Sequence, residues 1–389
     1  MNKSTELIHH PYVPPQGFDS PAVPVHKGST VFFDNVAAMR SRMWLDRSGY
    51  TYGLHGTPTS FTLEERIATL EGGKHTMLVS SGLAAVTMVD MALLKSGDQV
   101  LLPHNVYGPS KNFTRIELAA WGIGHAVYYA MDAASLSAAI TPATKLVWLE
   151  APGSVTLEFP DLRALIRVVR ERAPQAVIAL DNTWGAGIAF DAFALGIDVT
   201  IHALTKYPSG GGDLLMGSVT CRDDALYRTL ALSRSRVGHG VGMNDVEMVL
   251  RALPSMALRY VAQDAAGREF AAWCQTRKEF VRVLHPALPG SPGHEHWASH
   301  CTAAAGLVTV EFDPRFDTAQ TDAVVDALKL FRIGYSWAGP ISLVVPYDPK
   351  TIREGSSPFR GTLVRFCIGL EAAEDLIADA TQALRVLAT

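Results

Sequence analysis

Lys206 is the residue of this sequence with the clearest capacity for chemistry. It follows an apolar run at residues 199–203 that is typical of a buried strand, and a glycine-rich turn and a second apolar run, 214–220, come after it. We therefore expect Lys206 at the mouth of a strand. A lysine that is removed from water has a lowered pKa, so it is a nucleophile near neutral pH and can form a Schiff base with a carbonyl group.

Asp181 stands at the end of another apolar run, residues 176–180. Ligands of open α/β sheets bind at the carboxyl ends of the strands, so Asp181 and Lys206 are predicted at one sheet edge. Together they suit pyridoxal phosphate, whose ring nitrogen needs an acidic partner and whose aldehyde needs an amine. Taken alone, each residue is more often a turn cap or a solvated lysine, so the prediction depends on the pair.

The phosphate group of such a cofactor also needs a binding site. A short apolar run meets Ser81, Gly82 and Leu83, and a helical pattern begins there. Backbone N–H groups at a helix N-terminus bind phosphate, so these three residues are predicted to hold it. Thr205, next to the lysine, adds a hydroxyl donor unless it bonds the backbone at the strand end.

Longer motifs follow one another in order along the chain. The sequence resembles the Cys/Met-metabolism family of pyridoxal-phosphate enzymes, of fold type I, and within it most closely the bacterial cystathionine β-lyases, from about Pro24 to the C-terminus. The motifs that carry the resemblance are Leu70-Glu-Gly-Gly, Asp181-Asn-Thr-Trp, Thr205-Lys206-Tyr, His285-Pro-Ala-Leu-Pro-Gly-Ser, Tyr335-Ser336-Trp337 and Thr362-Leu-Val-Arg365-Phe-Cys-Ile-Gly-Leu-Glu371. Several ordered matches are much stronger evidence than one.

The resemblance implies further cofactor contacts. Tyr107 is implied to stack its ring on the cofactor pyridine, and Tyr52 to reach across a subunit interface to the partner's cofactor phosphate. Family members carry an arginine two residues after this tyrosine, whereas this chain has Leu54. Leucine cannot supply a charged bidentate clamp. Either His55 or another basic group replaces the arginine, or backbone N–H groups, Tyr52 and hydroxyls hold the phosphate.

The substrate site is implied in the same way. Arg365 lies within an apolar run, where an arginine is costly to bury unless a carboxylate joins it, and the resemblance implies that it binds the α-carboxylate of an amino acid. Ser336 and Trp337 are implied to line this site, and the tryptophan is typical of the β-lyases. Family members often carry a glutamate near the substrate entrance where this chain has Ile341, which leaves the preferred sulfur amino acid open.

The implied reaction is a β-elimination in methionine biosynthesis, which cleaves the Cβ–S bond of L-cystathionine to homocysteine, pyruvate and ammonia. Lys206 removes the Cα proton, and Lys206, Tyr107 or Tyr52 returns a proton to sulfur. Three alternatives stay open. They are a γ-acting relative (a γ-synthase or γ-lyase), a β-lyase for another cysteine S-conjugate, and a cofactor-binding protein without turnover.

The composition is typical of a metabolic enzyme. The chain has 389 residues and a formal charge of −4, which argues against a nucleic-acid-binding protein. It lacks a run of transmembrane length and a signal-peptide core, and its four cysteines are scattered, so we expect a reduced, cytoplasmic protein without membrane contact. His294, His296, His300 and Cys301 are metal-ligand types, but they fall in a predicted Pro/Gly loop, and no metal is expected.

Alternating patterns predict the architecture. Strands are predicted at 76–80, 99–102, 126–129, 146–149, 176–180, 199–203 and 214–220, and helices at 83–95, 110–121, 134–140, 162–172 and 190–195. This alternation predicts an α/β fold with a mostly parallel seven-stranded sheet covered on both faces. The resemblance implies the aspartate-aminotransferase-like form of that fold.

Three regions are predicted along the chain. Residues 1–58 are rich in proline and glycine, and the resemblance implies an arm that contacts a neighbouring subunit in a homotetramer, a dimer of dimers. Residues 59–255 form the cofactor-binding domain, and residues 256–389 form a smaller α+β domain. In that domain we predict a helix at 256–274, strands at 307–312, 342–345 and 364–368, and helices at 319–331 and 372–387.

Overall fold

The central element is a seven-stranded sheet of order β1-β7-β6-β5-β4-β2-β3, in a computed structural model that describes residues 3–9, 16–17, 20, 22–352 and 358–388. Its strands are β1 (His75–Val79), β2 (Gln99–Pro103), β3 (Gly124–Tyr128), β4 (Thr144–Glu150), β5 (Val177–Asp181), β6 (Val199–His202) and β7 (Gly217–Cys221). Pairs from β6 to β3 are parallel, whereas β7 runs antiparallel to β1 and β6. The predicted α/β fold is confirmed.

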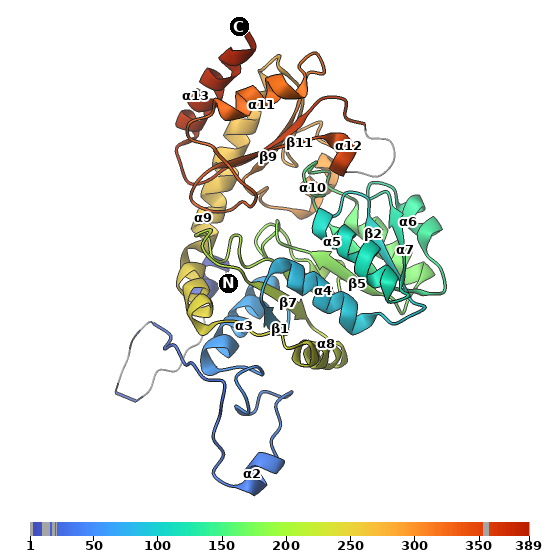
Figure 1. Ribbon diagram of the computed structural model, residues 1–389, viewed down its shortest axis with the longest axis vertical. Coiled ribbons are helices and arrows are strands. Elements are labelled where there is room, and N and C mark those ends of the chain that lie inside the picture. The colour runs from blue at the N-terminus through green and yellow to red at the C-terminus, as the bar shows by residue number, and fades with distance from the viewer. Residues whose placement is uncertain (1–2, 10–15, 18–19, 21, 353–357, 389) are drawn as a thin grey trace.

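Helices cover both faces of this sheet (Figure 1). They are α3 (Pro58–Glu71), α4 (Gly82–Leu93), α6 (Ala133–Ala139), α7 (Leu162–Arg172), α8 (Asp224–Val237) and α9 (Met243–Gln275). Side chains alternate between the faces along each strand. In β4, Val147 and Leu149 join a core with α3, α7 and α9, whereas Leu146 and Trp148 join a core with α4 and α8.

Several predicted helices differ in the structure, and the one predicted at 319–331 ends early, at Asp326. Residues 110–121 contain α5 (Gly108–Phe113) and a π-helical turn, η1 (Thr114–Leu118), so the hydrogen-bonding pattern changes within the run. Residues 190–195 contain only a 3-10 turn, η2 (Phe193–Leu195), which ends at Gly196 in the left-handed conformation. Short turns of this kind are common as connectors between larger elements.

A second, five-stranded sheet of order β10-β11-β12-β9-β8 follows α9. Its strands are β8 (Phe280–Leu284), β9 (Leu307–Phe312), β10 (Arg332–Ile333), β11 (Leu343–Tyr347) and β12 (Leu363–Cys367), and α11 (Thr318–Asp326), α12 (Pro349–Ile352), α13 (Ala373–Ala383) and η3 (Leu384–Ala388) complete this part. Helix α9 begins at residue 243 rather than 256 and continues through Pro254. It therefore crosses residue 255, and the domain limits stay a prediction.

The N-terminal segment has little secondary structure besides α1 (Lys3–Ile8) and α2 (Val36–Arg40). Figure 1 shows the chain around α2 extending away from the two sheets. Phe32 in this segment is 93% exposed, and Val36 and Met43 are exposed as well. Exposed apolar side chains that lie together mark interaction surfaces.

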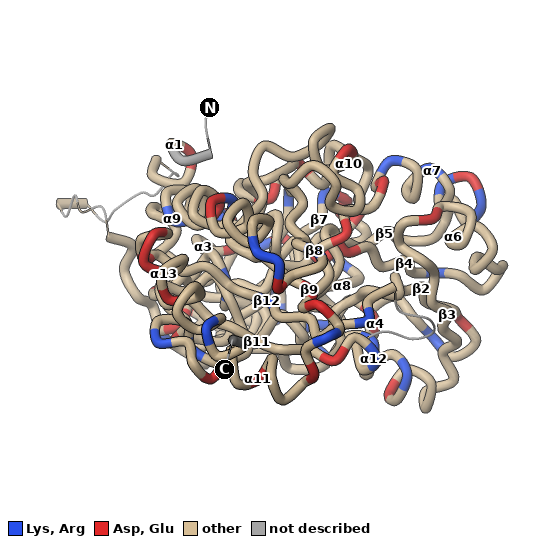
Figure 2. Tube along the Cα trace, turned by 90° about the horizontal axis from the view of Figure 1, so that it is seen from above, with Lys and Arg blue, Asp and Glu red and all other residues tan. Residues whose placement is uncertain are grey.

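Four further observations concern the described residues. None of their helices is both long and apolar enough to cross a lipid bilayer. None of their His, Cys, Asp and Glu side chains gather in a group suited to a metal ion. The predicted Pro/Gly loop around His294 is wrong in part, because residues 294–300 form a short helix, α10 (His294–His300). Basic and acidic residues are interspersed along the chain (Figure 2).

Asp90 is a carboxyl group inside the core between α4 and β4. Its Oδ1 accepts a hydrogen bond from Trp148 Nε1 at 2.8 Å, and its buried Oδ2 has no partner among the described residues. Burial raises the pKa of Asp90 to about 7, and the bond from Trp148 acts in the opposite direction. The folded protein therefore holds this proton more tightly than the unfolded chain does.

Stability should consequently fall as the pH rises. The contribution of Asp90 is complete below the ordinary aspartate pKa near 4 and is lost as the pH rises through about 7, with a slope of up to roughly 1.4 kcal/mol per pH unit. Asp90→Asn keeps an acceptor for Trp148 and removes the titration, so we expect its melting temperature to exceed that of the wild type more at pH 8 than at pH 5. The exposed Asp375→Asn is the control; an equal gain at both pH values would contradict the assignment.

Candidate active site

A cavity of about 720 Å³ lies at the carboxyl edge of the seven-stranded sheet. Asp181 and Lys206 line it from this sheet, and Trp337 and Arg365 line it from the chain that follows α9. Four residues predicted from separate motifs thus surround one space. A volume of this size is typical of small-molecule sites.

Lys206 lies four residues beyond β6, and its amine is enclosed by protein. Its Nζ donates a hydrogen bond to Ser336 Oγ at 2.6 Å and lies 5.3 Å from the centroid of the Trp337 ring. Burial lowers the pKa of Lys206 to about 8; Arg365 adds to this effect, whereas Cys367 and Asp181 oppose it. A substantial fraction of the amine is therefore neutral near physiological pH.

Asp181 is the last residue of β5, as predicted, and its carboxylate faces the cavity. Its Oδ1 accepts a hydrogen bond from the backbone N–H of Thr183 at 3.0 Å, and Thr183 Oγ1 accepts one from Ala203 N. Burial raises the pKa of Asp181, while hydrogen bonds from Thr183 and the charges of His202 and Lys206 favour the ionised form. These contacts join the Asp181 turn to the strand that leads to Lys206.

A buried polar network connects residues next to Asp181 at this edge of the sheet, and the sequence did not predict it. Glu71 accepts hydrogen bonds from Asn182 Nδ2 at 2.7 Å and pairs with His202 Nδ1 at 3.1 Å. Glu71 belongs to the Leu70-Glu-Gly-Gly motif and Asn182 to the Asp181 motif. The two motifs are therefore parts of one contact, which their separation in sequence conceals.

The N-terminus of α4 forms another wall of the cavity. Ser81 is the N-cap, and its side chain accepts a hydrogen bond from Ala84 N. Gly82 and Leu83 begin the helix, where backbone N–H groups lack intrahelical partners. A Cβ on Gly82 would lie 2.6 Å from the Cβ of Ala203, so only glycine lets the helix approach β6 this closely.

Thr205 and Tyr107 also line the cavity. The Thr205 hydroxyl donates to Met216 O at 3.2 Å and accepts from Met216 N at 3.1 Å, which is the backbone-bonded alternative that its position predicted. The Tyr107 ring is 43% exposed, and burial, Asp181 and Glu150 raise the pKa of its phenol. Their predicted cofactor roles stay predictions.

Arg365 lies in the middle of β12 and is 8% exposed. Its Nε is buried and has no hydrogen-bond partner among the described residues. The guanidinium carbon lies 5.5 Å from the centroid of the Tyr347 ring. A buried guanidinium with an unsatisfied donor on a cavity wall is suited to an incoming carboxylate.

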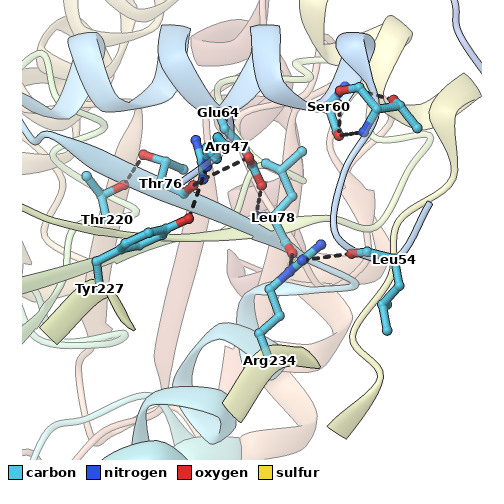
Figure 3. Close-up of polar contacts among 10 residues, drawn as sticks. Arg47, Leu54, Ser60, Glu64, Thr76, Leu78, Thr220, Tyr227 and Arg234 are labelled. Carbon is cyan, nitrogen blue, oxygen red and sulfur yellow. Dashed lines mark hydrogen bonds and ion pairs between the residues drawn. The ribbon is translucent and has the colours of Figure 1, made fainter. Parts of the chain in front are cut away.

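Tyr52 and Leu54 are outside the cavity of their own chain, and Tyr52 is 47% exposed. Arg234 holds this loop through the backbone, because its Nη1 donates to Leu54 O at 2.9 Å and its Nε donates to Leu78 O at 2.8 Å (Figure 3). His55 is engaged within the loop, with Thr51 Oγ1 2.8 Å from Nδ1. His55 does not line the cavity of its own chain, and its replacement of the arginine across a subunit interface stays a prediction.

A second arginine anchors the chain just before this loop (Figure 3). Arg47 forms an ion pair with Glu64 at 2.9 Å, donates to Tyr227 Oη at 3.1 Å and donates to Thr76 O. These partners belong to α3, α8 and β1. The start of the loop is thus tied to the body of the first sheet.

Ile341 does not line the cavity and is 56% exposed. The expectation that this position lies at the substrate entrance is therefore not supported within the single chain. Ser336 and Trp337, by contrast, both line the cavity next to Lys206.

The cavity's chemistry fits pyridoxal phosphate. Lys206 offers a partly neutral amine, and Asp181 offers a carboxylate at the same edge. The first turn of α4 offers backbone N–H groups around Gly82, and Arg365 offers an unsatisfied buried donor. Each requirement of the cofactor and of an amino-acid substrate is met by a different wall.

Comparison with known proteins identifies the family. The chain belongs to the family described as Cys/Met metabolism PLP-dependent enzyme, whose model matches residues 4–385, and its cofactor is accordingly pyridoxal phosphate. It is 35% identical over 360 residues to the cystathionine β-lyase of Salmonella typhimurium, which covers 91% of each chain. It is 30% identical over 389 residues to the cystathionine γ-lyase of Sus scrofa, covering 98% of this chain and 93% of the relative. The crystal structure of metB from Corynebacterium glutamicum superposes with a TM-score of 0.91 at 29% identity, covering 100% of this chain and 98% of that one.

The lowered pKa of Lys206 predicts selective reactivity. In the cofactor-free protein, acylation of Lys206 followed by mass spectrometry across a pH series should be half-maximal near pH 8. Arg365→Met removes a neighbouring positive charge and should move this midpoint upward. Exposed lysines such as Lys145 serve as internal controls. A Lys206 midpoint at the ordinary lysine value of 10.5 would contradict the burial argument.

Proposed function

We propose that this enzyme catalyses a β-elimination that cleaves the Cβ–S bond of L-cystathionine and, with one water, releases homocysteine, pyruvate and ammonia. The observation that carries the proposal is the Trp337 ring 5.3 Å from the Lys206 amine, in the cavity that also contains Asp181 and Arg365. The relative from Salmonella, named cystathionine β-lyase, supports the same reaction.

Arg365 anchors the substrate by its α-carboxylate. A carboxylate satisfies the buried Nε of Arg365 and offers a second oxygen for bidentate pairing. Arg365 and Lys206 line the same cavity, and the charge of Arg365 lowers the pKa of Lys206, so a substrate held by the first residue enters the space that the amine faces. Orientation of this kind lowers the barrier by removing the entropy cost of encounter.

Lys206 removes the proton from Cα. Its pKa of about 8 makes the neutral amine available without making it a weak base. Ser336 Oγ, 2.6 Å from Nζ, orients the amine. Ser336 has φ +110°, a left-handed conformation that a serine adopts only at a cost, as is common at functional sites.

Asp181 maintains the charge on which the reaction depends. Pyridoxal phosphate, when bound, would supply an electron sink for the pair left at Cα. Asp181 keeps the proton on the ring nitrogen through its negative charge, which the Thr183 N–H stabilises at 3.0 Å.

The departing sulfur requires a proton. Lys206 carries one after acting as base, and Tyr107 is a second donor in the same cavity, because its raised pKa keeps the phenol protonated. Tyr52, outside its own chain's cavity, can act only in the cavity of a second copy. Of these, Lys206 needs no further group, so we assign it the transfer.

A γ-acting relative is the principal alternative, supported by the similarity to the pig cystathionine γ-lyase. A β-lyase for another cysteine S-conjugate uses the same residues, with different contacts beyond sulfur. If the protein only bound the cofactor without turnover, the lowered pKa of Lys206 and the unpaired Nε of Arg365 would have no role.

Product analysis separates these activities. The cofactor-loaded enzyme incubated with L-cystathionine should form pyruvate and homocysteine in equal amounts, because the bond cut lies between Cβ and sulfur. Lys206→Ala should lower turnover by roughly 10³-fold or more, since it removes the base. Formation of 2-oxobutyrate and cysteine would establish γ-elimination instead; turnover only with other thioethers would establish a different β-lyase.

We also propose a homotetramer assembled from dimers, with the N-terminal arm on a neighbouring copy. The exposed Phe32 and Met43, together with Tyr52 outside its own cavity, support a second copy as the arm's partner. Phe32→Ser combined with Met43→Ser should reduce the mass measured by light scattering and weaken cofactor retention. Leu258→Ser, an exposed apolar position on α9, is the control. An active double variant of unchanged mass would contradict the arm's role.

A further inference from the structure

Glu150 is a carboxyl group of the cavity wall that the proposed reaction does not use. It is the last residue of β4 and lies in register with Asp181 on the parallel strand β5. Neighbouring strands are about 4.8 Å apart, and residues in register point to the same side. Two carboxyl groups therefore stand next to each other at the cofactor edge of the sheet.

The Glu150 side chain also contacts the tyrosine loop. Its Oε2 accepts a hydrogen bond from the backbone N–H of Tyr107 at 2.8 Å. Tyr107 is the N-cap of α5 and makes no side-chain capping bond, so this contact fixes the start of that helix. The adjacent Asn105 is held separately, since its carbonyl accepts from Ser154 N at 2.8 Å. Glu150 thus binds the backbone of Tyr107 directly, whereas Ser154 binds the backbone of Asn105.

The surroundings of the two carboxyl groups shift their pKa values for different reasons. Burial and the charge of Asp181 raise the pKa of Glu150 well above its usual range, against the smaller effects of the Tyr107 N–H, Lys111 and the Ser154 N–H. Asp181 has His202 and Lys206 to favour its ionised form. The two neighbouring carboxyl groups therefore differ in the charges that surround them: Asp181 has nearby cations that favour its ionised form, and its charge disfavours ionisation of Glu150.

We propose that Glu150 is a positioning residue, which fixes the Tyr107 backbone to the end of β4. The Tyr107 ring and the Asp181 carboxylate then contact the same bound cofactor from two directions. The inference rests on pyridoxal-phosphate binding at this site and not on which thioether is cleaved. The side chain acts as a hydrogen-bond acceptor of defined length.

Three variants distinguish geometry from charge. Glu150→Gln keeps the length and an acceptor oxygen without ionising, Glu150→Asp keeps the ionisable group but shortens it, and Glu150→Ala removes the acceptor. Titration of the cofactor-free protein with pyridoxal phosphate, followed by visible absorption, measures each dissociation constant. We expect the alanine variant to bind roughly tenfold more weakly, because the Tyr107 backbone loses its bond to β4 and the ring is no longer held in place, and we expect affinity in the order Gln, Asp, Ala.

A double-variant cycle tests whether Glu150 acts through Tyr107. If it does, Tyr107→Ala should remove most of the effect of Glu150→Ala on cofactor affinity, since contacting residues are not additive. Additive effects would overturn the proposal, as would tighter binding by Glu150→Asp than by Glu150→Gln, which would make charge the decisive property. The titration uses no thioether, so a failure of cystathionine cleavage leaves its result interpretable.

Discussion

Removal of the Lys206 amine from water is the constraint on which the site depends. Burial is the largest influence on its pKa, and the groups that enclose it come from both sheets. Ser336 and Trp337 belong to the chain that follows α9, whereas Lys206 follows β6. The reactive amine therefore exists only where the two parts of the fold meet, which ties the chemistry to their packing.

The second constraint is the sign of each buried charge. Burial raises the pKa of both Asp181 and Glu150, the charge of Asp181 raises that of Glu150 further, and Lys206 and His202 favour the ionised form of Asp181. In a medium of low dielectric constant, two adjacent anions would cost far more than in water. The raised pKa of Glu150 is thus partly an effect of the neighbouring Asp181 rather than a separate feature.

The sequence predicts what local periodicity determines. All seven strands of the first sheet and the placement of Asp181 and Lys206 at its edge follow from apolar runs that end in polar residues. Helix α8 is missed because its buried face includes Arg234, which interrupts the apolar pattern. Strand β8 is missed because Arg282 lies within it and pairs with Glu311 at 3.2 Å, a contact with β9. The partnership of Glu71, His202 and Asn182, and that of Glu150 with Tyr107, join residues that only the folded chain brings together.

Leu54 shows which part of a binding loop depends on its side chains. The loop is fixed by Arg234 through the Leu54 carbonyl, and the chain before it is fixed by Arg47. A bond to a carbonyl is indifferent to the side chain at that position, so the substitution of leucine for arginine leaves the path of the loop intact. In the proposed placement the phosphate lies at the N-terminus of α4, where the backbone N–H groups of Gly82 and Leu83 and the helix dipole favour an anion. A side chain at position 82 would lie 2.6 Å from the Ala203 Cβ, so the glycine is what allows this N-terminus to stand so close to the chain that leads to Lys206.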